Sequence, residues 1–233
     1  MDNKLEKFVK EVKEALGQNL KSFILYGSAA ADDRYKTSDL NTLIVVKDCD
    51  IVTLKSLHGP FKKWKKTGNP LPLLFTYERI KYADDIFPIE FLDIKESHAL
   101  LAGEDIFKKM KIRTQNLRLE IEREMKSAIL RLRSAYVLTG GSGKEVIKLM
   151  RDSVTTFTVI FKAIIRLYGK KAPVKKWDII MNMPKNFKVN HSIFADVLAL
   201  KEGRATVADA NIFFSAYMAE IERVNMIIDR FKK

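Results

Sequence analysis

Two short stretches of the sequence combine residue types that can hold a phosphate and a divalent cation. Gly27-Ser28 follows the apolar run 22–26, and Asp39-Leu40-Asn41 precedes the β-branched run 42–47. Glycine lets the backbone approach phosphate oxygens closely because it has no Cβ, and serine adds a hydroxyl donor. Side chains alternate along a strand, so Asp39 and Asn41 are expected on one face, where they offer two oxygen ligands to Mg²⁺. Each stretch alone is also compatible with an ordinary turn and a cap.

The elements that must position these residues follow from the spacing of apolar side chains. The first half of the chain is predicted to alternate helix and strand. Helices are expected at 3–16 and 50–66, strands at 22–26, 42–47, 72–76 and 88–94, and a turn with a short helix at 95–103.

The second half is predicted to be helical throughout. Helices are expected at 114–138, 145–168, 192–201 and 206–231, with a shorter one between Pro173 and Pro184. Long amphipathic helices with short connections indicate an antiparallel bundle. We therefore predict two domains, an α/β domain over 1–109 and an all-α domain over 110–233.

Composition narrows the class of protein. The 233 residues are 47% hydrophobic and 30% charged, with one cysteine and three histidines, which excludes a disulfide framework and disfavours a zinc cluster. No apolar run is long enough to span a membrane, and the N-terminus lacks an apolar signal core. A soluble, cytoplasmic protein is expected.

The net charge of +13 is concentrated in the second half. Residues 1–109 hold 18 basic and 17 acidic residues, whereas 110–233 hold 24 and 12. Such an excess favours nucleic acid or another polyanion as a partner, and a solvated lysine-rich surface explains it equally well. Oligomeric state does not follow from the sequence.

With these elements, the first 105 residues or so resemble the nucleotidyltransferase superfold shared by DNA polymerase β, aminoglycoside nucleotidyltransferases and minimal nucleotidyltransferases. The family signature is Gly-Ser, a spacer and Asp-x-Asp, matched here by Gly27, Ser28, Asp39 and Asn41. Proteins of the family also have an acidic residue on a later strand. In the segment 88–94 (PIEFLDI), Glu90 is its expected counterpart and Asp93 is the second candidate. The resemblance implies an α+β protein: a nucleotidyltransferase-like α/β domain with a small mixed sheet, followed by an antiparallel helical bundle.

The resemblance also implies an activity, the transfer of a nucleoside monophosphate from a nucleoside triphosphate to a hydroxyl acceptor with release of pyrophosphate. Gly27 and Ser28 would hold the β- and γ-phosphates. Asp39, Asn41 and Glu90 would act as catalytic ligands of Mg²⁺ or Mn²⁺.

The chain departs from the family pattern at two places. Asn41 replaces the second aspartate, which removes a negative charge beside the metal and weakens metal binding. Ala30-Ala31-Asp32 replaces Ala-Arg-Gly, so Arg34 or Lys36 would have to supply the missing cation. The alternative function is therefore a catalytically impaired nucleotidyltransferase fold that regulates by binding nucleotide or nucleic acid.

Two further motifs have simpler interpretations. The segment 139–145 (TGGSGKE) lacks the spacing and the Ser/Thr of a phosphate loop, so a link between two helices is expected. The segment 61–66 (FKKWKK) is either a nucleic-acid patch or an amphipathic helix that packs Phe61 and Trp64 on the sheet. Most arginines of the two long helices are expected to be surface charges paired with Glu120, Glu122 and Glu124, while some could contact triphosphate or a polyanion. They are Arg118, Arg123, Arg131, Arg133, Arg151 and Arg166.

Overall fold

The computed structural model describes residues 3–27, 29–30 and 39–231. Its contacts form two compact units, Met1–Arg113 and Thr114–Lys233, each described here on its own. The predicted boundary between two domains, at residues 109 and 110, stays a prediction.

Unit 1 is built on a four-stranded sheet of order β3-β2-β1-β4. Strand β1 pairs antiparallel with both β2 and β4, while β3 runs parallel to β2. The small mixed sheet is therefore confirmed. The strands are β1 (Leu20–Tyr26), β2 (Asn41–Val46), β3 (Leu73–Thr76) and β4 (His98–Gly103).

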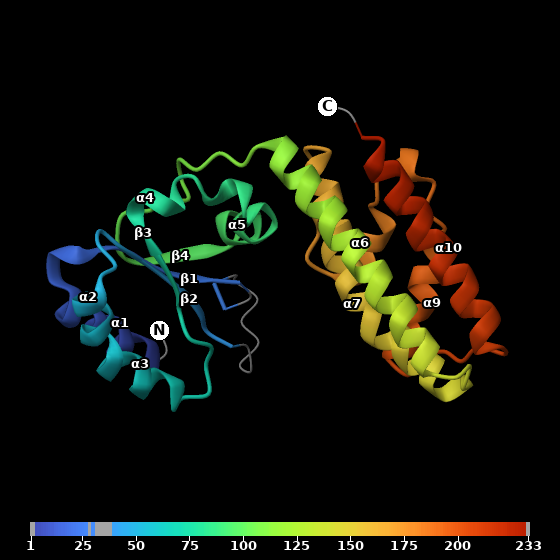
Figure 1. Cartoon of the computed structure of the whole chain (residues 1–233), viewed down its shortest axis with the longest axis horizontal. Helices are drawn as coiled ribbons and strands as arrows, with labels where there is room; N and C mark the ends of the chain where they lie inside the picture. The colour runs from blue at the N-terminus through green and yellow to red at the C-terminus, as the bar shows by residue number, and fades with distance from the viewer. Residues whose placement is uncertain (1–2, 28, 31–38, 232–233) are drawn as a thin grey trace. The chain divides into compact units, whose positions relative to one another are not determined.

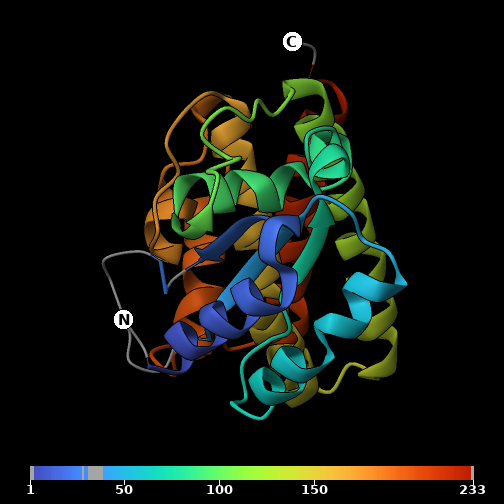
Figure 2. The same cartoon turned by 90° about the vertical axis from the view of Figure 1, so that its left-hand side faces the viewer.

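Helices cover both faces of this sheet (Figures 1 and 2). Alternate residues of β1 divide between the two layers: Phe23 and Leu25 pack with α1 and α3, whereas Ile24 packs with Phe91 of α5. The first layer is α1 (Asn3–Leu16), α2 (Ile51–Ser56) and α3 (His58–Lys65), and the second is α4 (Tyr77–Ile80) and α5 (Pro88–Glu96), with 3₁₀ turns at Gly17–Asn19 and Ala83–Asp85.

Two of the expected elements are wrong, and they are adjacent. Residues 88–94 form most of helix α5, because Pro88 stands at a helix start, where its missing N–H costs nothing. The segment expected to turn and form a short helix contains strand β4 instead, since pairing with β1 overrides the helix propensity of its Ala and Leu residues. Gly103 ends β4 with φ +79°, and a Cβ there would lie 2.1 Å from the carbonyl oxygen of Lys21.

Unit 2 is an antiparallel helical bundle, as predicted (Figure 1). A short turn reverses the chain between α6 and α7, and α7 packs against the four other helices. None of the described helices is long and apolar enough to cross a membrane. The helices are α6 (Thr114–Leu138), α7 (Gly143–Leu167), α8 (Lys176–Met181), α9 (His191–Lys201) and α10 (Ala210–Asp229), with a 3₁₀ turn at Lys185–Phe187.

Candidate functional site

The end of β1 and the start of β2 meet at one edge of the sheet, because the two strands are antiparallel neighbours. Tyr26 pairs with Asn41 in the strand register. Gly27 follows with φ +81°, and a Cβ added there would lie 3.5 Å from Asn41 Nδ2. The structure therefore brings Gly27 beside Asn41, two of the residues singled out in the sequence.

The turn at Gly27 is held from the α5–β4 junction. The Gly27 amide donates to the Ser97 carbonyl oxygen at 3.2 Å, and the Ser97 hydroxyl donates to the Gly27 carbonyl oxygen at the same distance. Ala30 N–H also donates to the Gly27 carbonyl oxygen, at 3.0 Å. Sequence reasoning missed Ser97, since a serine between a helix and a strand carries no specific signal.

A second side chain fixes the backbone between Asp39 and Asn41. The Leu40 amide donates to Asn69 Oδ1 at 2.9 Å, and Asn69 Nδ2 donates to the Thr67 hydroxyl at 2.9 Å. The Thr67 hydroxyl donates in turn to the carbonyl oxygen of Trp64 at 2.7 Å. Asn69 thus ties the start of β2 to the end of α3. An asparagine between Gly68 and Pro70 is typical of a break in the chain, and nothing in the sequence indicates that it anchors a strand.

Glu90 lies in the first turn of α5 and is exposed, so its expected position on a strand is wrong. It nevertheless acts on the same end of the sheet. Burial, and secondly the negative charge of Glu90, raise the pKa of the half-buried Tyr26 hydroxyl above its ordinary value. Tyr26 is the strand partner of Asn41, so this electrostatic effect is the link between Glu90 and the end of β1. Asp39, two residues before Asn41, is exposed.

The remaining predicted phosphate ligands, Ser28, Arg34 and Lys36, lie outside the described residues, and their assignment stays a prediction. Among the described residues, no group of three or more His, Cys, Asp or Glu side chains could hold a metal ion. The expected ligand set has two carboxylates and one amide, Asp39, Glu90 and Asn41. Three oxygen donors of this kind suit a hard cation such as Mg²⁺.

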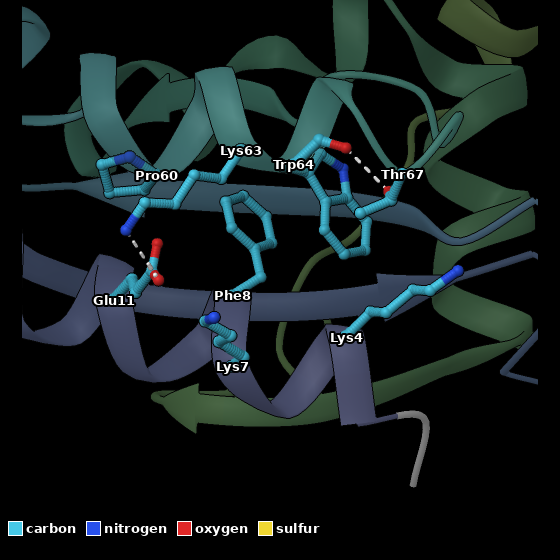
Figure 3. A pocket seen from close by; sticks show the side chains of 8 residues that line it. All are labelled: Lys4, Lys7, Phe8, Glu11, Pro60, Lys63, Trp64 and Thr67. Carbon is cyan, nitrogen blue, oxygen red and sulfur yellow. Dashed lines mark hydrogen bonds and ion pairs between the residues drawn. The ribbon is translucent and has the colours of Figure 1, made fainter.

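A pocket of about 260 Å³ between α1 and α3 contains none of the predicted site residues (Figure 3). Phe8 and Trp64 stack there with ring centroids 4.4 Å apart, and Lys63 Nζ lies 3.0 Å from Glu11 Oε1. Phe61 and Trp64 pack on the core of this face, so the amphipathic-helix interpretation of 61–66 is confirmed.

No protein-family model and no curated protein sequence matches the chain. Among solved structures, the chain is similar to spectinomycin adenyltransferase AAD(9) from Enterococcus faecialis, whose crystal structure contains ATP and spectinomycin. The TM-score is 0.55 at 11% identity, and the match covers 94% of this chain and 98% of that chain. At this identity the similarity shows the fold alone. The chain has a nucleotidyltransferase-like α+β fold followed by a helical bundle.

Proposed function

We propose that the protein is a Mg²⁺-dependent nucleotidyltransferase that moves a nucleoside monophosphate from a nucleoside triphosphate to a hydroxyl acceptor. The observation that supports this proposal is the position of Gly27 beside Asn41, the strand partner of Tyr26, at one end of a sheet with this fold. ATP is the first donor to test, because the structural neighbour was crystallised with it.

In the proposed reaction, the acceptor oxygen attacks the α-phosphorus, the bond to the β-phosphate oxygen breaks, and pyrophosphate leaves. Glu90 accepts the proton of the acceptor hydroxyl. The hydroxyl of Ser28 holds the β- and γ-phosphates, and Gly27, whose N–H already donates to Ser97, leaves room for their oxygens because it has no Cβ. Asp39, Asn41 and Glu90 are the residues that would hold Mg²⁺ or Mn²⁺. The chemistry that a bound cation supplies is neutralisation of the triphosphate and a lower pKa for the acceptor hydroxyl.

One observation favours a second function. Asn41 is a neutral amide where the family has a carboxylate, so the site has one negative charge fewer beside the cation. A protein of this kind would bind nucleotide or another polyanion and regulate a partner without turnover.

A thermal-shift experiment with ATP, GTP, CTP and UTP, each with and without Mg²⁺, tests the proposal. A ligand present at about 100 times its dissociation constant adds about 2.7 kcal/mol to the free energy of unfolding, so binding raises the melting temperature. We expect a Mg²⁺-dependent shift for at least one nucleotide, followed by pyrophosphate release once an acceptor is found. A shift without turnover on any hydroxyl acceptor supports the regulator, and no shift with any nucleotide contradicts both functions.

Asn41→Asp restores the second carboxylate of the family pattern. We expect it to tighten Mg²⁺-dependent nucleotide binding, because the added charge attracts the cation. Isothermal titration with ATP and Mg²⁺ measures the effect, and Asn182→Asp on the second unit is the charge-matched control. An unchanged metal affinity would show that Asn41 is not a ligand.

A further inference from the structure

Unit 1 has an open apolar groove on the side of α3 that is turned away from α1. The residues of α3 divide by helical spacing: Pro60, Lys63 and Trp64 line the pocket shared with α1, whereas His58, Phe61, Lys62 and Lys65 line the groove. The opposite wall of the groove is formed by Leu71 and Leu74, at and just before the edge strand β3. Its volume is about 470 Å³.

The floor of this groove is apolar and reaches the surface. Leu54 is 46% exposed and Leu71 is 51% exposed, and Phe61 and Leu74 lie between them and the core. Ile51, one turn before Leu54 on α2, is 65% exposed and extends the apolar surface. Adjoining exposed apolar side chains with a polar rim are typical of a binding surface.

The rim of the groove is basic. Lys62 and Lys65 stand on it beside His58, and no acidic residue lines the groove. Two other cavities of the described residues differ in this respect, because Glu11 lines the pocket between α1 and α3, and Glu6 and Glu14 line the one beside Leu101. Within the described part of the chain, neither Lys62 nor Lys65 forms an ion pair, whereas Lys63 pairs with Glu11.

We propose that this groove binds an acidic amphipathic helix of a partner protein. An apolar helix stripe at positions i, i+3 and i+7 would lie on Leu54, Phe61 and Leu71, and carboxylates flanking the stripe would meet Lys62 and Lys65. Charge complementarity selects an acidic segment over a basic one, and the apolar floor selects an amphipathic segment over a uniformly acidic one. The proposal does not depend on nucleotidyl transfer, because none of the predicted site residues lines the groove.

The test uses the full chain and a fluorescein-labelled synthetic helix in which leucines form one stripe and glutamates flank it. Fluorescence anisotropy measures binding, and we expect saturable binding that weakens as salt increases. Two peptides serve as controls: one with the same composition but no apolar stripe, and one with lysine in place of glutamate. We expect neither to bind with comparable affinity.

Variants assign the binding to the groove. Lys62→Glu with Lys65→Glu should raise the dissociation constant about tenfold, because two attractive pairs become repulsive. Leu54→Ser with Leu71→Ser should also weaken binding, and both leucines are exposed enough for the fold to tolerate the change. The matched control is Lys10→Glu with Lys13→Glu on α1, which changes the net charge equally at another surface.

Three results would overturn the proposal. Equal binding of the peptide without a stripe means that charge alone is responsible. An equal loss in the α1 control means that net charge and not the groove is sensed. A concentration-dependent dimer that Leu71→Ser dissociates means that a second copy of this chain occupies the groove.

Discussion

At the scale of single residues, Gly27 combines a left-handed backbone conformation with a position beside the Asn41 side chain. Its φ of +81° lies in the left-handed region, and its missing Cβ leaves the Asn41 amide next to the backbone. The positive φ makes the position sensitive to substitution, whereas an added Cβ would meet Asn41 Nδ2 at an ordinary van der Waals distance of 3.5 Å.

Gly27→Ala should lower the free energy of unfolding by about 1–2 kcal/mol, because an L-residue in the left-handed region is strained. Urea denaturation measures the change. Gly143→Ala is the control: Gly143 lies at the start of helix α7, a Cβ there meets only Ala210 Cβ at 3.8 Å, and alanine should stabilise slightly. Equal effects of the two substitutions would contradict the strained conformation at Gly27.

Tyr26 reports the position of Glu90. The carboxylate raises the pKa of the Tyr26 hydroxyl, because a phenolate beside it places two negative charges close together. Glu90→Gln removes that charge and should lower the Tyr26 pKa toward its ordinary value of 10.0, although burial keeps it above that value. Ultraviolet titration of the phenol measures the pKa, and subtraction of a Tyr26→Phe titration assigns it. An unchanged pKa would place Glu90 too far away to serve the site.

At the scale of elements, the start of β2 depends on a residue of the loop before β3. Asn69→Ala removes the acceptor of the Leu40 amide and the donor to Thr67. We expect a loss of about 1–3 kcal/mol in stability, together with faster hydrogen exchange at Leu40.

Asn69→Asp distinguishes the contributions of the two hydrogen bonds. It keeps an oxygen that accepts from the Leu40 amide and loses the amide group that donates to Thr67. We expect it to retain slow exchange at Leu40 while losing part of the stability. If both variants leave exchange at Leu40 unchanged, Asn69 does not anchor the strand.

The same scale shows what the sequence could predict. Although the pairing of Tyr26 with Asn41 is a contact distant in sequence, the positions of β1 and β2 follow from local pattern, because each strand contains an uninterrupted apolar run, 23–26 and 43–46. Helix α5 and strand β4 do not. The apolar residues of 88–94 fit a short strand as well as a helix, and HALLAG becomes a strand only because β1 offers it a neighbour. Asn69 and Ser97 act through contacts distant in sequence, which one chain without structure does not reveal.

At the scale of the whole molecule, the positive charge of the second half is partly neutralised within unit 2. Lys126 Nζ lies 2.6 Å from Glu122 Oε1 and 3.0 Å from Asp229 Oδ1, and Arg133 Nη2 lies 2.7 Å from Glu222 Oε1. Arg118 also pairs with Glu122 at 2.8 Å, as expected from the helical spacing. The pairs with Asp229 and Glu222 tie α6 to α10, the pairs with Glu122 lie within α6, and all of them reduce the number of cations free to meet a polyanion.

Unit 2 should fold as a separate fragment over residues 114–233. Its core joins Phe157, Phe161, Phe194 and Tyr217 in edge-to-face contacts between α7, α9 and α10, all inside the unit. We expect a helical circular dichroism spectrum and one cooperative thermal transition. The absence of a cooperative transition, in this fragment but not in the full chain, would mean that the bundle needs residues 1–113.

The strand order has a consequence for synthesis of the chain. β1 can pair with β2 soon after both are made, but its other neighbour is β4, where Ser22 pairs with Gly103, 81 positions later (103 − 22). On the ribosome, the inner strand therefore keeps one edge open until β4 has emerged. Contacts this distant in sequence slow folding, and an uncovered strand edge invites pairing with other chains. A pause in translation after β4 has left the ribosome would give this sheet time to close before the long helices of unit 2 emerge.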